Sequence, residues 1–253
     1  MKLTYFINAA LCGIAAASPC GFESDSHQWH RPLPDQVRSP CPGLNVMANH
    51  GYLPRSGKNI DLATLRSALS AAYNYHPNTF DDAFAQAIAF DLSTTGNSST
   101  FNLDDLKLHD AVEFDGSLSR NDFYSGDNLN YDPAIWKIVA EHLRLNKNGP
   151  RKEDKYVTVE AAAKARAARV QDAINRNPTF NASANQIQGS PGTTALYLTT
   201  LWDDKAGAAP KSWVKAFFED ERIPWREGYK KPEKQRNGTD IGILFERVSA
   251  VEV

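Results

Sequence analysis

One cysteine of this chain lies between two prolines and immediately precedes an apolar run. The stretch SPCPGLN, residues 39–45, continues into further apolar residues at Met47 and Ala48. Proline suits the first position of a helix, because the amide that it lacks would have no partner there and its ring presets the helical backbone. The pattern therefore predicts a helix that begins at Pro42 and is capped by Cys41.

The Cys41 sulfur would then face the unpaired amides of Gly43 and Leu44 at the positive end of the helix dipole. Both influences favour a thiolate. A fixed thiolate can act as a nucleophile or as a soft metal ligand, and a nucleophile requires a nearby histidine as base. His50 lies more than two helical turns further on, so we interpret it as a hydrogen-bonded structural histidine. The option that remains is haem iron, to which an axial thiolate donates electrons that favour O–O cleavage.

Helical periodicity predominates in the mature chain. Capping residues and prolines bound several segments whose apolar residues recur at the spacing of one helical face. The predicted helices cover residues 62–73, 80–88, 133–143, 159–176 and 210–218. Residues 19–40, rich in proline, histidine and serine, predict an extended arm laid over the core. The sequence has no alternating strand pattern of useful length, and so we expect a mainly α single domain with long loops.

The composition narrows the class of function. With 253 residues, of which 42% are hydrophobic, the chain can bury one sizeable core. Its formal net charge of -2 offers no basic surface of the kind that nucleic acid or an anionic membrane requires. We therefore expect neither partner.

Residues 1–18, MKLTYFINAALCGIAAAS, have the layout of a secretory signal peptide, with one lysine, a short apolar centre and a small-residue ending. A frayed N-terminal helix is the alternative. No other stretch approaches the roughly 20 apolar residues that a membrane span needs. We therefore expect a secreted protein whose mature domain covers residues 19–253. Asn97, Asn181 and Asn237 begin sequons for N-glycosylation, which predicts a glycoprotein.

The three cysteines leave few pairing options. Cys12 would be removed with the signal peptide, so the mature chain would keep Cys20 and Cys41. Two cysteines cannot build a disulfide scaffold, but they can form one bridge. A bridge between them is therefore the alternative to a metal-binding Cys41.

Residues 39–60, SPCPGLNVMANHGYLPRSGKNI, closely resemble the N-terminal signature of the fungal haem-thiolate peroxidases, the chloroperoxidase and unspecific peroxygenase family. The resemblance implies a chloroperoxidase-like helical fold of the short type around a buried haem b, with the cysteine as proximal iron ligand. The cofactor-binding residues that it implies are Cys41, Pro42, Gly43 and Leu44. Residues 210–232 resemble the family's C-terminal helix and exit loop, so the similarity spans nearly the whole mature chain. The family also contains dimers, so Cys20 could join two chains in a homodimer.

A further block, residues 106–128, resembles the family's metal-binding stretch. The resemblance implies that the Glu113 carboxylate, the Phe114 carbonyl and the Ser117 hydroxyl bind Mg²⁺ or Mn²⁺ beside a haem propionate. Hard oxygen ligands suit such a cation. Without the resemblance, the acidic spacing of Glu113 and Asp115 would indicate only a charged turn.

The chain departs from the family where peroxide is activated. The family places a glutamate on a helix above the iron to move a proton between the two oxygens, and Thr193 occupies its position within residues 192–198. Residues 173–202 contain no acidic residue, so a small shift in alignment cannot restore the carboxylate. Phe114 occupies the position at which short members often carry a histidine that orients this acid.

These departures leave three functions open. Threonine is a poor proton acceptor, and general acid–base catalysis is typically worth about 10²–10⁴-fold in rate, so we expect slow use of hydrogen peroxide. The first function is a peroxygenase that transfers oxygen from peroxide to a small apolar organic substrate. The second is a tailoring enzyme of secondary metabolism, an isomerase or dehydratase that uses iron as a Lewis acid without peroxide. The third is a haem-binding protein without catalysis.

Overall fold

The computed structural model describes residues 27–253, and the predicted signal peptide, Cys12 and Cys20 lie outside this range. Helices account for nearly all of its regular structure, as predicted from the sequence. The α-helices of the described residues are α1 (Pro42–Asn49), α2 (Leu62–Tyr73), α3 (Asp81–Ala89), α4 (Pro133–His142), α5 (Lys152–Lys155), α6 (Val159–Arg176), α7 (Ala184–Thr200), α8 (Lys211–Glu219) and α9 (Gly238–Ser249). Two strands of two residues each, β1 (Tyr156–Val157) and β2 (Ala209–Pro210), pair antiparallel with Tyr156 opposite Pro210.

Local capping explains why several helices begin where the sequence predicts. The Asp61 carboxylate accepts the Thr64 amide at 2.7 Å at the start of α2. Asp132 caps α4, where proline occupies the first helical position, and the Thr158 hydroxyl caps α6. Such caps satisfy amides that have no partner within the helix. The predicted helices over residues 62–73, 133–143 and 159–176 are therefore confirmed.

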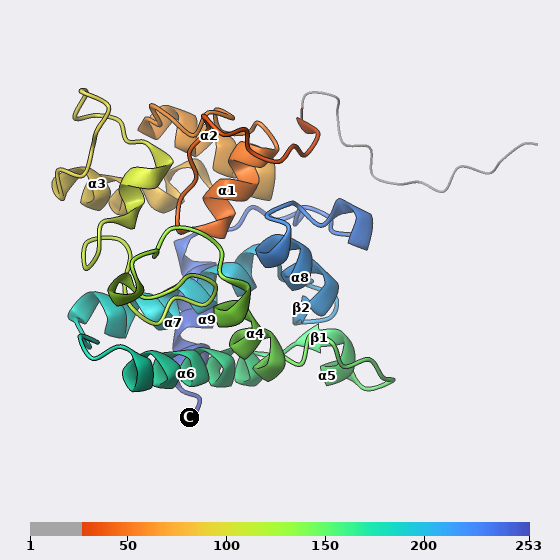
Figure 1. Ribbon diagram of the computed structural model, residues 1–253. Helices are drawn as coiled ribbons and strands as arrows, with labels where there is room; N and C mark the ends of the chain where they lie inside the picture. Colours follow the sequence, from red (N-terminus) through yellow and green to blue (C-terminus); the bar gives the residue numbers. More distant parts are fainter. Residues whose placement is uncertain (1–26) are drawn as a thin grey trace, which may run out of the picture.

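The helix α7 has no comparable local signal, because its interior contains Gly189, Pro191 and Gly192. Glycine and proline are the poorest helix formers, so contacts with other helices have to stabilise this segment. α7 packs against α9 and α6, and Figure 1 shows α6 along one end of the molecule and α1, α2 and α3 gathered at the other. The resemblance alone predicted a helix here.

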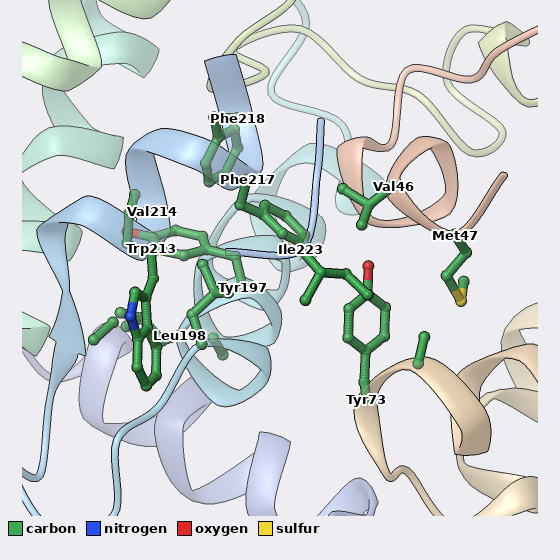
Figure 2. Packing of buried hydrophobic residues seen from close by; sticks show 14 of the residues in the cluster. Val46, Met47, Tyr73, Tyr197, Leu198, Trp213, Val214, Phe217, Phe218 and Ile223 are labelled. Atoms are coloured by element: carbon green, nitrogen blue, oxygen red, sulfur yellow. The ribbon is translucent and has the colours of Figure 1, made fainter. Parts of the chain in front are cut away.

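The helix α8 supplies the aromatic centre of the core. Phe218 stacks on Trp136 of α4, with ring centroids 4.5 Å apart, and meets Tyr197 of α7 edge-on at 5.3 Å. Figure 2 shows Phe217 and Phe218 of α8 among buried side chains of α1, α2 and α7. Aromatic pairs of this kind contribute beyond the area that they bury. The packing holds α8 beside α1, which begins after Cys41.

The segment before α1 crosses the surface of the core as an extended arm, and the prediction is confirmed for residues 27–40. The His30 amide donates to the Asn49 carbonyl at 3.0 Å, and the Val37 amide donates to the Ser56 carbonyl at 2.9 Å. The arm thereby covers the end of α1. No helix among the described residues is long and apolar enough to cross a membrane.

Candidate active site

Cys41 occupies the N-terminal cap of α1, as predicted. Its backbone is extended, Pro42 fills the first helical position, and the side chain is a free thiol. The loop before the helix is fixed by Asn45, whose side chain accepts the Ser39 amide at 2.7 Å and donates to the Ser39 carbonyl at 2.8 Å. The Ser39 hydroxyl in turn accepts the Cys41 amide at 3.2 Å. These contacts fix the backbone that carries the Cys41 side chain.

Burial and the nearby amides act on the pKa of the Cys41 thiol with opposite signs. Burial, the largest influence, raises the pKa of the Cys41 thiol above its ordinary value. The amides of Leu44 and Gly43 and the charge of Arg120 act in the opposite direction and lower that pKa. The described residues form no cap hydrogen bond of regular geometry to this sulfur. The amides at the helix start therefore act in the predicted direction, while burial opposes them.

A cavity of about 420 Å³ opens beside Cys41, and α1, α2, α3, α7 and α8 all contribute to its wall. Every residue that the sequence predicted for the site belongs to this wall: Cys41, Pro42, Gly43, Leu44, Glu113, Phe114, Ser117 and Thr193. Most of the remaining wall is apolar or aromatic, including Met47, Phe84 and Phe217. Apolar cavities with a few convergent polar groups are typical of sites for small molecules and cofactors.

The three predicted oxygen ligands of a divalent cation lie together in the cavity wall. The Ser117 hydroxyl donates to the Phe114 carbonyl at 3.0 Å and lies 3.5 Å from Oε1 of Glu113. Oε2 of Glu113 is already engaged, because it accepts Asn128 Nδ2 at 2.7 Å and contacts His109 Nδ1 at 2.8 Å. One carboxylate oxygen is therefore held in place, while the other lies beside the hydroxyl and the carbonyl.

Charge and burial compete at Glu113. Burial is the largest influence and raises its pKa, whereas the hydrogen bonds from His109 and Asn128 lower it. No cluster of three or more His, Cys, Asp and Glu side chains gathers anywhere in residues 27–253 in a way that could hold a metal ion. The candidate set instead combines a carboxylate, a carbonyl and a hydroxyl, which suits Mg²⁺ or Mn²⁺ better than zinc.

Thr193 lies on α7 and is exposed at the cavity wall. Its hydroxyl donates to the Ser190 carbonyl of the same helix at 3.1 Å. Phe114 is buried and packs against α7 at Gly189, where the absence of a side chain makes room for the aromatic ring. Among the described residues that line the cavity, Glu113 is the only acid. The structure thus brings both sequence departures, Thr193 and Phe114, to the same cavity.

His50 is the buried structural histidine that the sequence predicts. It is 1% exposed, its Nδ1 contacts the His27 carbonyl at 2.8 Å, and its Nε2 accepts the Ile223 amide at 3.0 Å. Both ring nitrogens are therefore occupied by backbone groups. The residue has no part in the chemistry of the cavity.

Sequence reasoning missed an ion pair beside the cavity. Arg120 is 2% exposed, belongs to the cavity wall and binds Glu221 Oε1 at 2.5 Å. Glu221 belongs to the charged run at residues 219–222. Its side chain is only 17% exposed and pairs with Arg120. The partners are 101 residues apart in sequence, so no local pattern signals the pair.

Comparison with known proteins gives one consistent family. The family described as "Peroxidase, family 2" matches residues 27–234. An aromatic peroxygenase of Coprinellus radians is 25% identical over 221 residues, which cover 79% of this chain and 82% of the relative. An aromatic peroxygenase of Cyclocybe aegerita is 25% identical over 238 residues, covering 88% of this chain and 62% of the relative. A dothistromin biosynthesis peroxidase of Dothistroma septosporum is 28% identical over 219 residues, covering 81% of this chain and 51% of the relative.

Proposed function

The chain belongs to peroxidase family 2, the fungal haem-thiolate peroxidases, and from this premise we propose that it is a secreted peroxygenase-type enzyme. It transfers oxygen from hydrogen peroxide to a small apolar organic substrate, and its distal site is atypical. The observation that carries the proposal is the cavity, whose wall contains the free thiol of Cys41 at the start of α1 and is otherwise mostly apolar. A family member of this kind is an oxidoreductase, and the finer assignment rests on these residues.

The donor set of the cavity fits a haem b. Cys41 would hold the iron through its sulfur, because a thiol loses its proton on binding a metal and the Gly43 and Leu44 amides stabilise the resulting charge. Arg120 lies in the same wall, where its buried guanidinium is paired with Glu221. When bound, the haem supplies the activation of peroxide and the transfer of one oxygen atom.

The same wall fits a divalent cation. Glu113, the Phe114 carbonyl and Ser117 would hold Mg²⁺ or Mn²⁺, whose charge would offset that of a haem carboxylate. Asn128 and His109 fix the Glu113 carboxylate from behind. Such supporting partners orient a metal ligand and tune its basicity.

Proton transfer is the weak part of this site. The Thr193 hydroxyl directs its proton to the Ser190 carbonyl, so it does not offer that proton to a bound peroxide in this arrangement. Threonine also cannot act as a base near neutral pH. The Phe114 ring makes the adjoining wall apolar, which favours an apolar substrate and leaves no histidine to orient an acid. We therefore expect peroxide turnover that is slow for the reaction class.

The proposal is tested with purified protein loaded with haem. The reduced, carbon-monoxide-bound protein should show the long-wavelength band of a thiolate ligand, and peroxide with an aromatic or aliphatic substrate should give oxygenated product. Thr193→Glu should raise the rate, whereas Thr193→Val, which removes the hydroxyl at nearly constant volume, should leave it low. Absence of the thiolate band in the wild-type protein would exclude the proposal.

A second candidate is a tailoring enzyme that uses the iron as a Lewis acid without peroxide. It is favoured by the lack of a free acid in the described part of the cavity wall, since Glu113 is engaged by His109 and Asn128. A relative named a dothistromin biosynthesis peroxidase supports a biosynthetic role, although its name also implies the use of peroxide. Turnover of a substrate in the absence of peroxide would select this candidate. A thiolate spectrum with tight ligand binding and no product under either condition would instead identify a haem-binding protein.

A further inference from the structure

Glu221 lies where four separate segments of the protein meet. Its carboxylate oxygen Oε1 accepts Asn45 Nδ2 at 2.8 Å and Arg120 Nη2 at 2.5 Å. Its backbone carbonyl accepts Asn49 Nδ2 at 3.0 Å and Trp29 Nε1 at 3.1 Å. Glu221, two residues after the end of α8, therefore connects the N-terminal arm, α1 and the cavity loop that carries Arg120.

The backbone of Glu221 is in the left-handed region, with φ at 46°. A residue with a Cβ avoids this region, which glycine adopts readily. Such a conformation costs free energy and persists where surrounding contacts hold it, as the contacts of Glu221 do. Glycine at this position would relax the backbone but would remove the carboxylate that binds Asn45 and Arg120.

The carboxylate also matters for the charge felt at Cys41. Arg120 and Glu221 both act on the sulfur, and they act with opposite signs. Because Arg120 is 2% exposed, solvent screens its charge only weakly. Glu221 is the one acid that pairs with this guanidinium among the described residues. Its negative charge therefore opposes the effect of the Arg120 charge on the sulfur.

We propose that Glu221 is a positioning residue for the iron-binding sulfur, which fixes the Cys41 loop through Asn45 and balances the charge of Arg120. This inference rests on the proposed function, because it concerns the sulfur as a haem ligand. With Glu221 neutral, the unbalanced guanidinium would withdraw electron density from the sulfur. The sulfur would then donate less to the iron, and the reduced iron would be favoured.

The experiment compares Glu221→Gln with Asp220→Asn in haem-loaded protein. Both variants remove one negative charge, but Asp220 is 52% exposed and pairs with Arg222 at the surface. The glutamine keeps an oxygen that accepts from Asn45 or Arg120, so the loop retains much of its support. We expect both variants to bind haem with a thiolate band, and only Glu221→Gln to shift the reduction potential in the positive direction. Equal potentials in the two variants, or a negative shift in Glu221→Gln, would overturn the inference.

A third variant covers the case in which Glu221→Gln does not take up haem. Glu221→Asp keeps the charge on a shorter side chain, so its potential should stay near that of the wild type while its thermal stability falls. If the reduction potential of Glu221→Asp shifted in the positive direction by as much as the loss of a charge would cause, the role in charge balance would be contradicted. Failure of the proposed function looks different, because the wild-type protein itself would then lack the thiolate band.

Discussion

The ring of Phe114 lies against the backbone of Gly189, so closely that a Cβ at Gly189 would stand 2.5 Å from the ring carbon Cε1. This contact joins the loop of the candidate cation site to α7, the helix that carries Thr193. It explains why α7 has a glycine in its interior despite the cost to the helix. The position of the Phe114 ring and the course of α7 therefore depend on each other.

Gly189→Ala should destabilise the protein by roughly 1–3 kcal/mol, the usual cost of overpacking a well-filled site. Gly192→Ala is the matched control on the same helix, because nothing lies within 4 Å of the added Cβ. There, the better helix propensity of alanine should stabilise the protein by about 0.5–1 kcal/mol. Thermal or urea unfolding measures both. Equal stability of the two variants would mean that Phe114 moves aside without cost.

Restoring the family's acid–base pair should require both of its members. Thr193→Glu alone should raise kcat/KM for peroxide, and Phe114→His alone should change it little, because a histidine without the acid has nothing to orient. The double variant should gain more in kcat/KM, expressed as free energy, than the sum of the two single variants. Its total gain should approach the roughly 10²–10⁴-fold of general acid–base catalysis. Steady-state kinetics of the four proteins give the coupling energy. If the effects of the two substitutions on free energy were strictly additive, positions 193 and 114 would not act as a pair.

The cation site predicts a graded loss of metal. His109→Ala removes a partner of the Glu113 carboxylate and should weaken Mg²⁺ or Mn²⁺ binding by roughly 10–100-fold, as loss of a supporting partner typically does. Glu113→Gln removes a ligand charge and should cost at least as much. Asp110→Asn is the control, since this side chain is 42% exposed and lies 3.9 Å from His109. Elemental analysis of dialysed protein reports the bound cation. Unchanged metal content in Glu113→Gln would refute the site.

The start of α2 should contribute stability that depends on pH. Hydrogen bonds from Thr64, above all from its backbone amide, lower the pKa of Asp61 below its ordinary value. A depressed pKa in the folded state means that the contribution is complete above the unfolded pKa and is lost as the pH falls through the folded one. Asp61→Ala should therefore cost about 0.5–2 kcal/mol near neutral pH. The difference from wild type should shrink in acid, in urea unfolding followed from pH 7 down to pH 3. A difference that grows in acid would contradict the cap.

Residues with local signals were predictable, and residues defined by distant partners were not. Pro42 and Asp61 mark the starts of their helices in the sequence, because a cap acts within three or four residues. The capping box of Asn237 and Asp240 is an equally local signal for α9, and it was overlooked. The Arg120–Glu221 pair had no such signal, because its members meet only through the tertiary fold.

The residues of the candidate site were predictable on different grounds. The place of Cys41 followed from the chemistry of a helix start, whereas Glu113 and Ser117 followed only from the resemblance to a family. Neither route could show that burial would raise the pKa of the thiol, because desolvation depends on side chains contributed by several helices. The supporting roles of His109 and Asn128 also required the structure.

The wall of the cavity draws on residues from Pro40 to Phe218, so no fragment of the chain can assemble it alone. A ligand that fills this cavity therefore binds only when the chain is completely folded. It would also stabilise the native chain by mass action, by about 2.7 kcal/mol when the free ligand is a hundredfold above its dissociation constant. Titrating porphyrin into the protein without haem should consequently raise its melting temperature, and unfolding should remain a single cooperative transition.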